Sequence, residues 1–262
     1  MASPWGDAAA ESGVNVDLSG RRVLVTGGGS GIGQACAERL SAAGAHVVVA
    51  DLDAEAATHV ASDVGGTPWA VDLFDLDAVD MVETPIDILI NNAGLQRVAP
   101  VDDFPPEAFS QILRVMLEAP FRLARRVLPH MYEQGWGRIV NISSVHGLRA
   151  SPYKAAYVSA KHGLEGLSKV LALEGAEHGV TSTCVNPAYV RTPLVEKQIN
   201  AQADAHGLSP EEVVSRVMLE PAAIKRLVEP AEVAELVTYL CGPQASFMTG
   251  SSVPIDGGWT AR

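Results

Sequence analysis

The feature that most constrains this chain is a glycine-rich turn, TGGGSGIG at residues 26–33, placed between an apolar run and a helical pattern. The preceding run, RVLVT at 22–26, indicates a buried strand, and residues 34–45 repeat apolar side chains at helical spacing. A second apolar run, HVVVA at 46–50, follows and leads into Asp51. Glycines allow positive φ and close backbone approach, and the N-terminus of a helix offers free N–H groups to a diphosphate. The pattern therefore predicts a strand–turn–helix–strand unit that binds a dinucleotide.

The same alternation of apolar runs and helical patterns continues to the C-terminus. Further strands are expected at 67–73, 86–92, 138–144, 181–187 and 252–258, and further helices at 75–82, 106–134 and 153–178. This order predicts an α/β fold, a single Rossmann-type doubly wound parallel sheet with helices on both faces. We assign residues 17–262 to one dinucleotide-binding and catalytic domain, 1–16 to a flexible N-terminal tail, and 188–229 to a candidate helical substrate lid.

Charge and cysteine content exclude several classes of protein. The 262 residues carry 19 Lys and Arg against 31 Asp and Glu, a formal charge of −12, which disfavours nucleic acid as a partner. Cys36, Cys184 and Cys241 lie far apart without CxxC spacing, which argues against a metal site and for a reducing compartment. Neither a signal peptide nor a run of about 18 apolar residues is visible. We expect a cytoplasmic protein with no membrane contact and no metal.

Asp51 bears on which dinucleotide is bound. An acid at the end of the second strand accepts hydrogen bonds from the adenosine ribose hydroxyls and repels a 2′-phosphate. No Arg or Lys follows Asp51 in the run ADLDAEAA, and Ser30 rather than a basic residue precedes Gly31. These features favour NAD over NADP.

Three further motifs complete a family pattern. Tyr157 and Lys161, in YVSAK, share one face of a predicted helix, and Ser144 ends a predicted strand upstream. NNAG at 91–94 ends another strand. With the glycine turn, these motifs stand in the order and spacing of the classical short-chain dehydrogenases/reductases, which the chain resembles over residues 18–262.

The resemblance implies hydride transfer between a carbinol carbon and nicotinamide. Tyr157 would be the general acid and base, Lys161 would lower its pKa and hold the nicotinamide ribose, and Ser144 would hydrogen-bond the substrate oxygen. The family's usual Asn on the long helix is Met116 here, so we expect a rearranged proton relay or a slow enzyme. The cofactor-binding residues implied are Gly27, Ser30, Gly31, Ile32, Gly33, Asp51, Asp72, Leu73, Asn92, Ala93, Gly94, Tyr157, Lys161, Pro187, Val190 and Thr192.

Within that family the chain is similar to the bacterial D-3-hydroxybutyrate dehydrogenases of ketone-body metabolism. The similar stretches are 91–105, 143–163, 192–199 and the ending PIDGGWTAR. A short hydroxy acid offers little apolar area, so its carboxylate must supply the affinity through charge-assisted hydrogen bonds. The resemblance implies (R)-3-hydroxybutyrate and acetoacetate as the substrate pair, bound by Gln96, Ser144, His146, Lys154, Tyr157 and Gln198.

Three alternatives remain open at this point. One is a 3-oxoacyl-carrier-protein or acetoacetyl-CoA reductase, which Asp51, Ser30 and the negative charge disfavour because such reductases tend to use NADPH and meet acidic carriers. The second is another NAD-dependent short-chain alcohol dehydrogenase, and the third is a catalytically weak dinucleotide-binding scaffold, against which Ser144, Tyr157 and Lys161 argue. The two long predicted helices carry broad apolar stripes, and the family pairs them across a dimer axis, so a homotetramer is expected.

Overall fold

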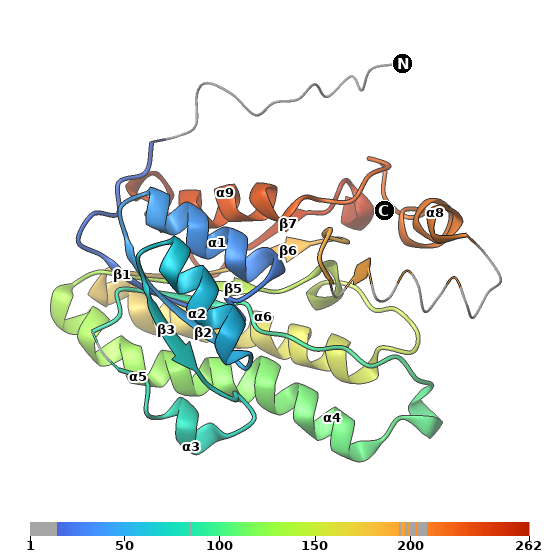
Figure 1. Ribbon diagram of the computed structural model, residues 1–262, viewed down its shortest axis with the longest axis horizontal. Helices are drawn as coiled ribbons and strands as arrows, with labels where there is room; N and C mark the ends of the chain where they lie inside the picture. The colour runs from blue at the N-terminus through green and yellow to red at the C-terminus, as the bar shows by residue number, and fades with distance from the viewer. Residues whose placement is uncertain are drawn as a thin grey trace.

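A seven-stranded sheet forms the centre of the computed structural model, which describes residues 15–83, 85–193, 195, 196, 199, 203 and 209–261 (Figure 1). The strands are β1 (Arg22–Thr26), β2 (His46–Asp51), β3 (Thr67–Ala70), β4 (Ile88–Asn91), β5 (Gly137–Ile142), β6 (Val180–Pro187) and β7 (Ser252–Ile255). Their order is β3-β2-β1-β4-β5-β6-β7, and every neighbouring pair is parallel. The predicted parallel sheet is confirmed.

Helices cover both faces of this sheet in two layers (Figure 1). Side chains of α1, α2 and α9 pack in one hydrophobic core, and side chains of α3, α4, α5 and α6 pack in the other. The α-helices within the described residues are α1 (Gly31–Ala42), α2 (Ala54–Asp63), α3 (Leu76–Val79), α4 (Pro106–Leu113), α5 (Ala119–Gln134), α6 (Ala155–Gly175), α8 (Pro210–Val213) and α9 (Pro230–Cys241).

The continuous burial of the central strands follows from these two layers. Every residue of β5 and of β6 is buried, because a parallel sheet between two helix layers faces no solvent on either side. A third, smaller hydrophobic cluster, which includes Val195, Val213 and Met218, lies in the segment that follows β6. The candidate lid therefore has a small core of its own.

Several elements differ from the expectation. α2 and α9 were not predicted, and β3 ends at Ala70, where the Val71 N–H still bonds to Asp51 before the chain turns away. The helix expected at 75–82 is only the short α3. The helix expected at 106–134 is α4 and α5 joined by one π-helical turn at Arg114–Glu118.

The strand order positions the ligand site. The chain builds β2 and β3 on one side of β1 and then crosses to place β4 on the other side. In open α/β sheets, ligands bind in the crevice at the carboxyl ends of the strands where the order reverses. The loops after β1, β4, β5 and β6 therefore meet at one edge of the sheet.

Among the described residues, no helix is long and apolar enough to cross a membrane.

Candidate active site

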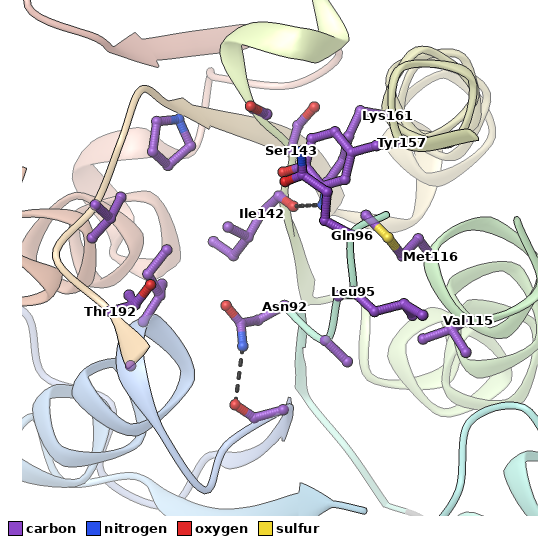
Figure 2. Close-up of a pocket in the computed structure, with 18 of the residues that line it drawn as sticks. Asn92, Leu95, Gln96, Val115, Met116, Ile142, Ser143, Tyr157, Lys161 and Thr192 are labelled. Carbon is purple, nitrogen blue, oxygen red and sulfur yellow. Dashed lines mark hydrogen bonds between the residues drawn. The ribbon is translucent and has the colours of Figure 1, made fainter. Parts of the chain in front are cut away.

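A cavity of about 440 Å³ opens at the carboxyl ends of the central strands. It is lined by nearly all of the residues that the sequence singled out (Figure 2). Gly33 is instead buried at the start of α1, and Gln198 lies outside the described residues. The predicted residues that line the cavity are Gly27, Ser30, Gly31, Ile32, Asp51, Asp72, Leu73, Asn92, Ala93, Gly94, Gln96, Ser144, His146, Lys154, Tyr157, Lys161, Pro187, Val190 and Thr192.

The glycine turn brings the backbone close to its neighbours, which only glycine permits here. Gly27 has φ +61°, and a Cβ on it would lie 2.9 Å from the Cα of Ala93. A Cβ on Gly33 would overlap the carbonyl oxygen of Gly27. The turn leads into the N-terminus of α1, which has no acidic residue in its first turn. Its free N–H groups are therefore available to an anionic group in the cavity.

Asn92 and Thr26 hold the turn in place. The side-chain amide of Asn92 donates to the carbonyl oxygen of Thr26 at 2.9 Å and to that of Gly27 at 3.1 Å. Figure 2 shows one of these hydrogen bonds as a dashed line from Asn92. The Thr26 hydroxyl accepts from the backbone N–H groups of Asn92, at 3.0 Å, and Ala93, at 3.2 Å. Both amide hydrogens of Asn92 are thus used to position backbone, so this side chain shapes the cavity wall.

Two carboxylates line one end of the cavity, that of Asp51 at the end of β2 and that of Asp72, which follows β3. Asp51 accepts from the backbone N–H of Gly29 at 2.9 Å and from that of Asp53 at 3.1 Å. Asp53 in turn caps α2 by accepting from two backbone N–H groups. The lysines among the described lining residues are Lys154 and Lys161, and Lys161 contacts β5, three strands away from β2. This end of the cavity is therefore acidic.

Tyr157, Lys161 and Ser144 come together at β5 and α6. The Lys161 ammonium donates to the carbonyl oxygen of Ile142 at 2.6 Å, and its Nζ lies 5.6 Å from the ring centroid of Tyr157 (Figure 2). Burial lowers the pKa of Lys161 to about 8. Burial also raises the pKa of Tyr157, and a hydrogen bond with Ser144 acts in the opposite direction. In the chain alone the desolvation of Tyr157 thus outweighs the lowering expected from Lys161.

His146 and Lys154 form a pair at the other side of Tyr157. The Lys154 ammonium donates to Nε2 of His146 at 3.0 Å, so the imidazole is neutral with its proton on Nδ1. Burial, and then the charge of Lys154, lower the pKa of His146 to about 4. Burial lowers the pKa of Lys154 to about 8. A partly desolvated cation therefore stands beside the candidate reaction centre.

Two aromatic residues of this end were not predicted as site residues. The ring of Trp259 meets that of His146 edge to face at 5.6 Å and lies tilted against Tyr189 at 5.7 Å. Lys154 donates to the Tyr189 hydroxyl at 3.4 Å. Both residues stand in stretches that the sequence pointed to, Tyr189 just after β6 and Trp259 in the C-terminal PIDGGWTAR.

Met116 lies on the cavity wall, in the π-helical turn between α4 and α5. Its side chain is buried, and a Cβ on Gly94 would lie 3.5 Å from Met116 Cε. In Figure 2 this thioether lies next to Gln96, on the same side of the view as Tyr157 and Lys161.

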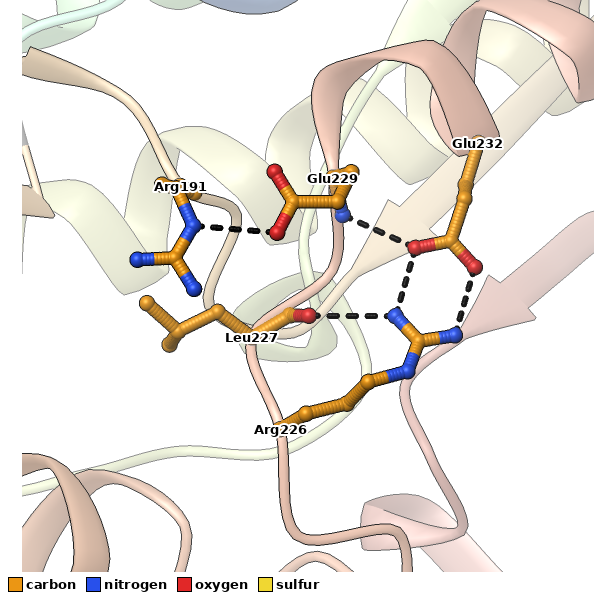
Figure 3. Close-up of polar contacts among 5 residues, drawn as sticks. All are labelled: Arg191, Arg226, Leu227, Glu229 and Glu232. Atoms are coloured by element: carbon orange, nitrogen blue, oxygen red, sulfur yellow. Dashed lines mark hydrogen bonds and ion pairs between the residues drawn. The ribbon is translucent and has the colours of Figure 1, made fainter. Parts of the chain in front are cut away.

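The candidate lid leaves and re-enters the fold at one point (Figure 3). Val190 and Val228 form an isolated parallel bridge, and Arg191 donates to Glu229 at 2.9 Å. Arg226 binds Glu232 of α9 through both terminal nitrogens, at 2.6 and 2.7 Å. The intervening segment is thus anchored at its two ends.

Similarity to known proteins extends over nearly the whole chain. Residues 21–203 match the short chain dehydrogenase family. A D-beta-hydroxybutyrate dehydrogenase of Rhizobium meliloti (strain 1021) is 42% identical and is aligned over 92% of this chain and 99% of its own length. An acetoacetyl-CoA reductase of the same strain is 34% identical, over 91% and 98%. A solved structure from Agrobacterium tumefaciens, named as a 2-deoxy-d-gluconate 3-dehydrogenase with bound NADP, is 31% identical with a TM-score of 0.83, over 94% and 98%.

Proposed function

The chain belongs to the short-chain dehydrogenase family and is an oxidoreductase, and we propose that it transfers a hydride between NAD and a short 3-hydroxy acid, with (R)-3-hydroxybutyrate and acetoacetate as the substrate pair. The family resemblance read from the sequence is confirmed. The observation that carries the choice of substrate is the Lys154–His146 pair, a desolvated cation next to Tyr157 and Ser144.

The cavity supports binding of a dinucleotide. The glycine turn, in which the Cβ of another residue at Gly27 or Gly33 would contact backbone atoms, leads into the N-terminus of α1. A turn of this kind at a helix N-terminus can accept a diphosphate. We assign the diphosphate to the backbone between Gly27 and Gly33, the adenosine to Asp51, Asp72, Leu73 and the Asn92–Gly94 wall, and the nicotinamide end to Lys161 and the segment from Pro187 to Thr192.

The acidic end of the cavity supports NAD over NADP. Asp51 lines this end of the cavity, and two backbone N–H groups fix the position of its carboxylate. A 2′-phosphate at this end would meet Asp51 without an Arg or Lys among the described lining residues nearby, and like charges repel. The solved relative with bound NADP shows that the fold also accepts the phosphorylated cofactor, so the preference rests on these side chains.

Proton transfer is assigned to Tyr157. A bound dinucleotide would supply the acceptor for the hydride of the carbinol carbon. The alcohol proton passes to the oxygen of Tyr157, while Ser144 donates a hydrogen bond to the substrate oxygen. The raised pKa of Tyr157 keeps the phenol protonated in the chain alone, which is the form needed as an acid in ketone reduction. In the oxidising direction the Lys161 ammonium, one turn along α6, favours the phenolate.

Substrate recognition is assigned to the end of the cavity at Lys154. The ammonium would bind the carboxylate directly, and the neutral imidazole of His146 orients it by accepting one of its hydrogens. Tyr189 and Trp259 close this end with aromatic rings, so a four-carbon acid fits better than a long thioester. Gln96 and Gln198 are proposed as additional amide contacts.

We also propose an assembly and a location. The anchored segment 188–229 would act as the lid of a single domain over 17–262, after a tail at 1–16. The exposed apolar side chains of Phe121, Val170 and Leu173 on α5 and α6 support pairing of these helices in a homotetramer. Three buried, unpaired cysteines support a reducing, cytoplasmic location.

The test is a cofactor and substrate panel on the purified full chain. NAD reduction by (R)-3-hydroxybutyrate is expected to exceed both NADP reduction and the oxidation of NADPH by an acetoacetyl thioester. Faster thioester reduction with NADPH would assign the chain to the reductases instead. Dinucleotide binding without turnover of any alcohol in the panel would support the scaffold alternative.

A further inference from the structure

Glu165 is a buried acid that the mechanism above does not use. It lies on α6 one helical turn beyond Lys161, and only 5% of its surface is exposed. Its two oxygens accept from Asn186 Nδ2 and from Ser252 Oγ, each at 2.6 Å. An ionised carboxylate is costly to bury, so a site that keeps one satisfies it with such short hydrogen bonds.

Through Asn186 this carboxylate reaches the proposed reaction centre. The same Asn186 amide that donates to Glu165 also donates to the backbone carbonyl of Ser144 at 3.0 Å. Lys161, also on α6, donates to the carbonyl of Ile142, two residues before Ser144. The chain at and just after the end of β5 is therefore tied to α6 at two points, at Ile142 directly and at Ser144 through Asn186.

Neighbouring elements pack closely around the Glu165 side chain. A Cβ on Gly147 would lie 2.8 Å from Glu165 Oε1, so the loop after Ser144 packs directly on the carboxylate. Ser252 belongs to β7, at the edge of the sheet, so the carboxylate also joins β7 to α6. Four elements meet at this one side chain.

Glu165 stands four residues after Lys161 on α6, so the two residues share one face of the helix. The titratable groups around Lys161 are Tyr157 and Glu165 on α6 and Cys184 on β6. Burial raises the pKa of the Cys184 thiol, which keeps that thiol neutral, so Glu165 is the anion of the group. Burial lowers the pKa of Lys161 to about 8, and Cys184 and Glu165 act against that shift.

We propose that Glu165 is a positioning residue for the proposed reaction: through Asn186 it fixes the Ser144 backbone, and its carboxylate is the buried counter-charge of Lys161. The proposal rests on the proposed role of Tyr157 and Lys161 as a proton-transfer pair. It gives α6 a second function besides carrying those two residues, because the same helix orients the strand end that presents Ser144.

The charge has a consequence that a purely structural acid would lack. Tyr157 and Lys161 share protons, so their titration belongs to the pair. Removal of a nearby negative charge favours loss of the first proton from the pair, whichever residue carries it. It also lowers the share of molecules that keep the remaining proton on Lys161 and leave Tyr157 as phenolate. The acid limb of alcohol oxidation should therefore move to lower pH while the plateau rate falls.

The experiment compares Glu165→Gln with the wild type, with Glu174→Gln, an exposed acid on the same helix, as the matched control. Gln preserves the contacts, because its oxygen accepts from Asn186 and its amide donates to the Ser252 hydroxyl. For Glu165→Gln the acid limb of kcat/KM is expected about one pH unit lower, with a reduced plateau. Glu174→Gln should match the wild type in both respects.

A second readout needs no turnover. The ultraviolet difference spectrum between each protein and its Tyr157→Phe partner reports ionisation of that phenol with pH. Ionisation of Tyr157 at lower pH in Glu165→Gln than in the wild type supports the role of Glu165. This readout holds even if 3-hydroxybutyrate is not a substrate, a result that would refute only the proposed function. An unchanged titration of Tyr157 in a folded Glu165→Gln protein would overturn the role of Glu165. Glu165→Leu should lose Ser144 positioning as well, with a larger fall in kcat than Gln gives, and equal falls would refute the path through Asn186.

Discussion

Replacement of Lys154 by Met tests how the carboxylate of the substrate is held. Met keeps the apolar length of the side chain and removes the ammonium that lies 3.0 Å from His146 Nε2 and 3.4 Å from the Tyr189 hydroxyl. A hydrogen bond to a charged group contributes about 1.5–3 kcal/mol, and each 1.36 kcal/mol is tenfold, so kcat/KM for 3-hydroxybutyrate should fall roughly 10- to 150-fold. The Kd for NAD should not change, because Lys154 lies away from the acidic end of the cavity.

The assay is NADH formation against 3-hydroxybutyrate concentration, with NAD affinity measured separately by fluorescence. Lys169→Met, which replaces an exposed lysine of α6, is the control and should match the wild type. The pH dependence gives a second check. The pKa of Lys154 is lowered to about 8, so its ammonium is present below pH 8 and lost above it. Butyrate, used as an inhibitor that carries the carboxylate, should therefore bind more weakly above that pH, and its Ki should rise. Equal losses of hydroxy acid and NAD affinity in Lys154→Met would refute the reasoning.

Three further predictions concern the cofactor side and the cavity wall. Asp51→Ala should lower kcat/KM with NAD about 10- to 150-fold, because charge-assisted hydrogen bonds are lost. In steady-state assays the ratio of kcat/KM with NAD to kcat/KM with NADP should also fall, and an unchanged ratio would refute the role of Asp51 in cofactor choice. Gly33→Ala should lower the free energy of unfolding by about 1–3 kcal/mol in urea titrations, because its Cβ overlaps the Gly27 carbonyl, and wild-type stability would contradict this. Met116→Asn should change turnover and its pH profile if the proton relay is rearranged, and identical profiles would show that the position is unimportant.

The sheet could be predicted from the sequence because its strands are covered on both faces. That arrangement produces apolar runs such as VVVA at 47–50, and β1, β2, β5 and β6 begin and end within about two residues of the expected bounds. Two helices, α2 and α9, were not predicted from the sequence, for different reasons. α9 begins after Glu229, a residue that seldom caps helices, although its capping box with Glu232 is present. α2 carries an ordinary signal in its Asp53 cap but is short and rich in Ala.

The site was predictable where it depends on motifs and unpredictable where it depends on tertiary packing. The glycine turn, Ser144, Tyr157 and Lys161 stand at fixed places on strands and helices, and the cavity collects them. Tyr189 and Trp259 are 70 residues apart in the chain and meet only because β6 and β7 are neighbours in the sheet.

The burial of Tyr157 could not be predicted from the spacing of residues in the sequence either. The sequence places a cation one turn from Tyr157 and so suggests a lowered pKa. The structure shows that desolvation raises it in the chain alone, and burial cannot be read from an i, i+4 pair. The π-helical turn at Arg114–Glu118 is another example, since residues at helical spacing do not reveal where a helix takes one extra residue per turn.

The most direct test of the account is the oxidation rate of Tyr157→Phe with NAD saturating. Removal of one hydroxyl eliminates the group that takes the alcohol proton, so kcat should fall by about 10²- to 10⁴-fold while the variant still binds NAD. If the Phe variant oxidised its alcohol substrate at the wild-type rate, proton transfer would run through another group and the assignment of this cavity as the reaction centre would be wrong.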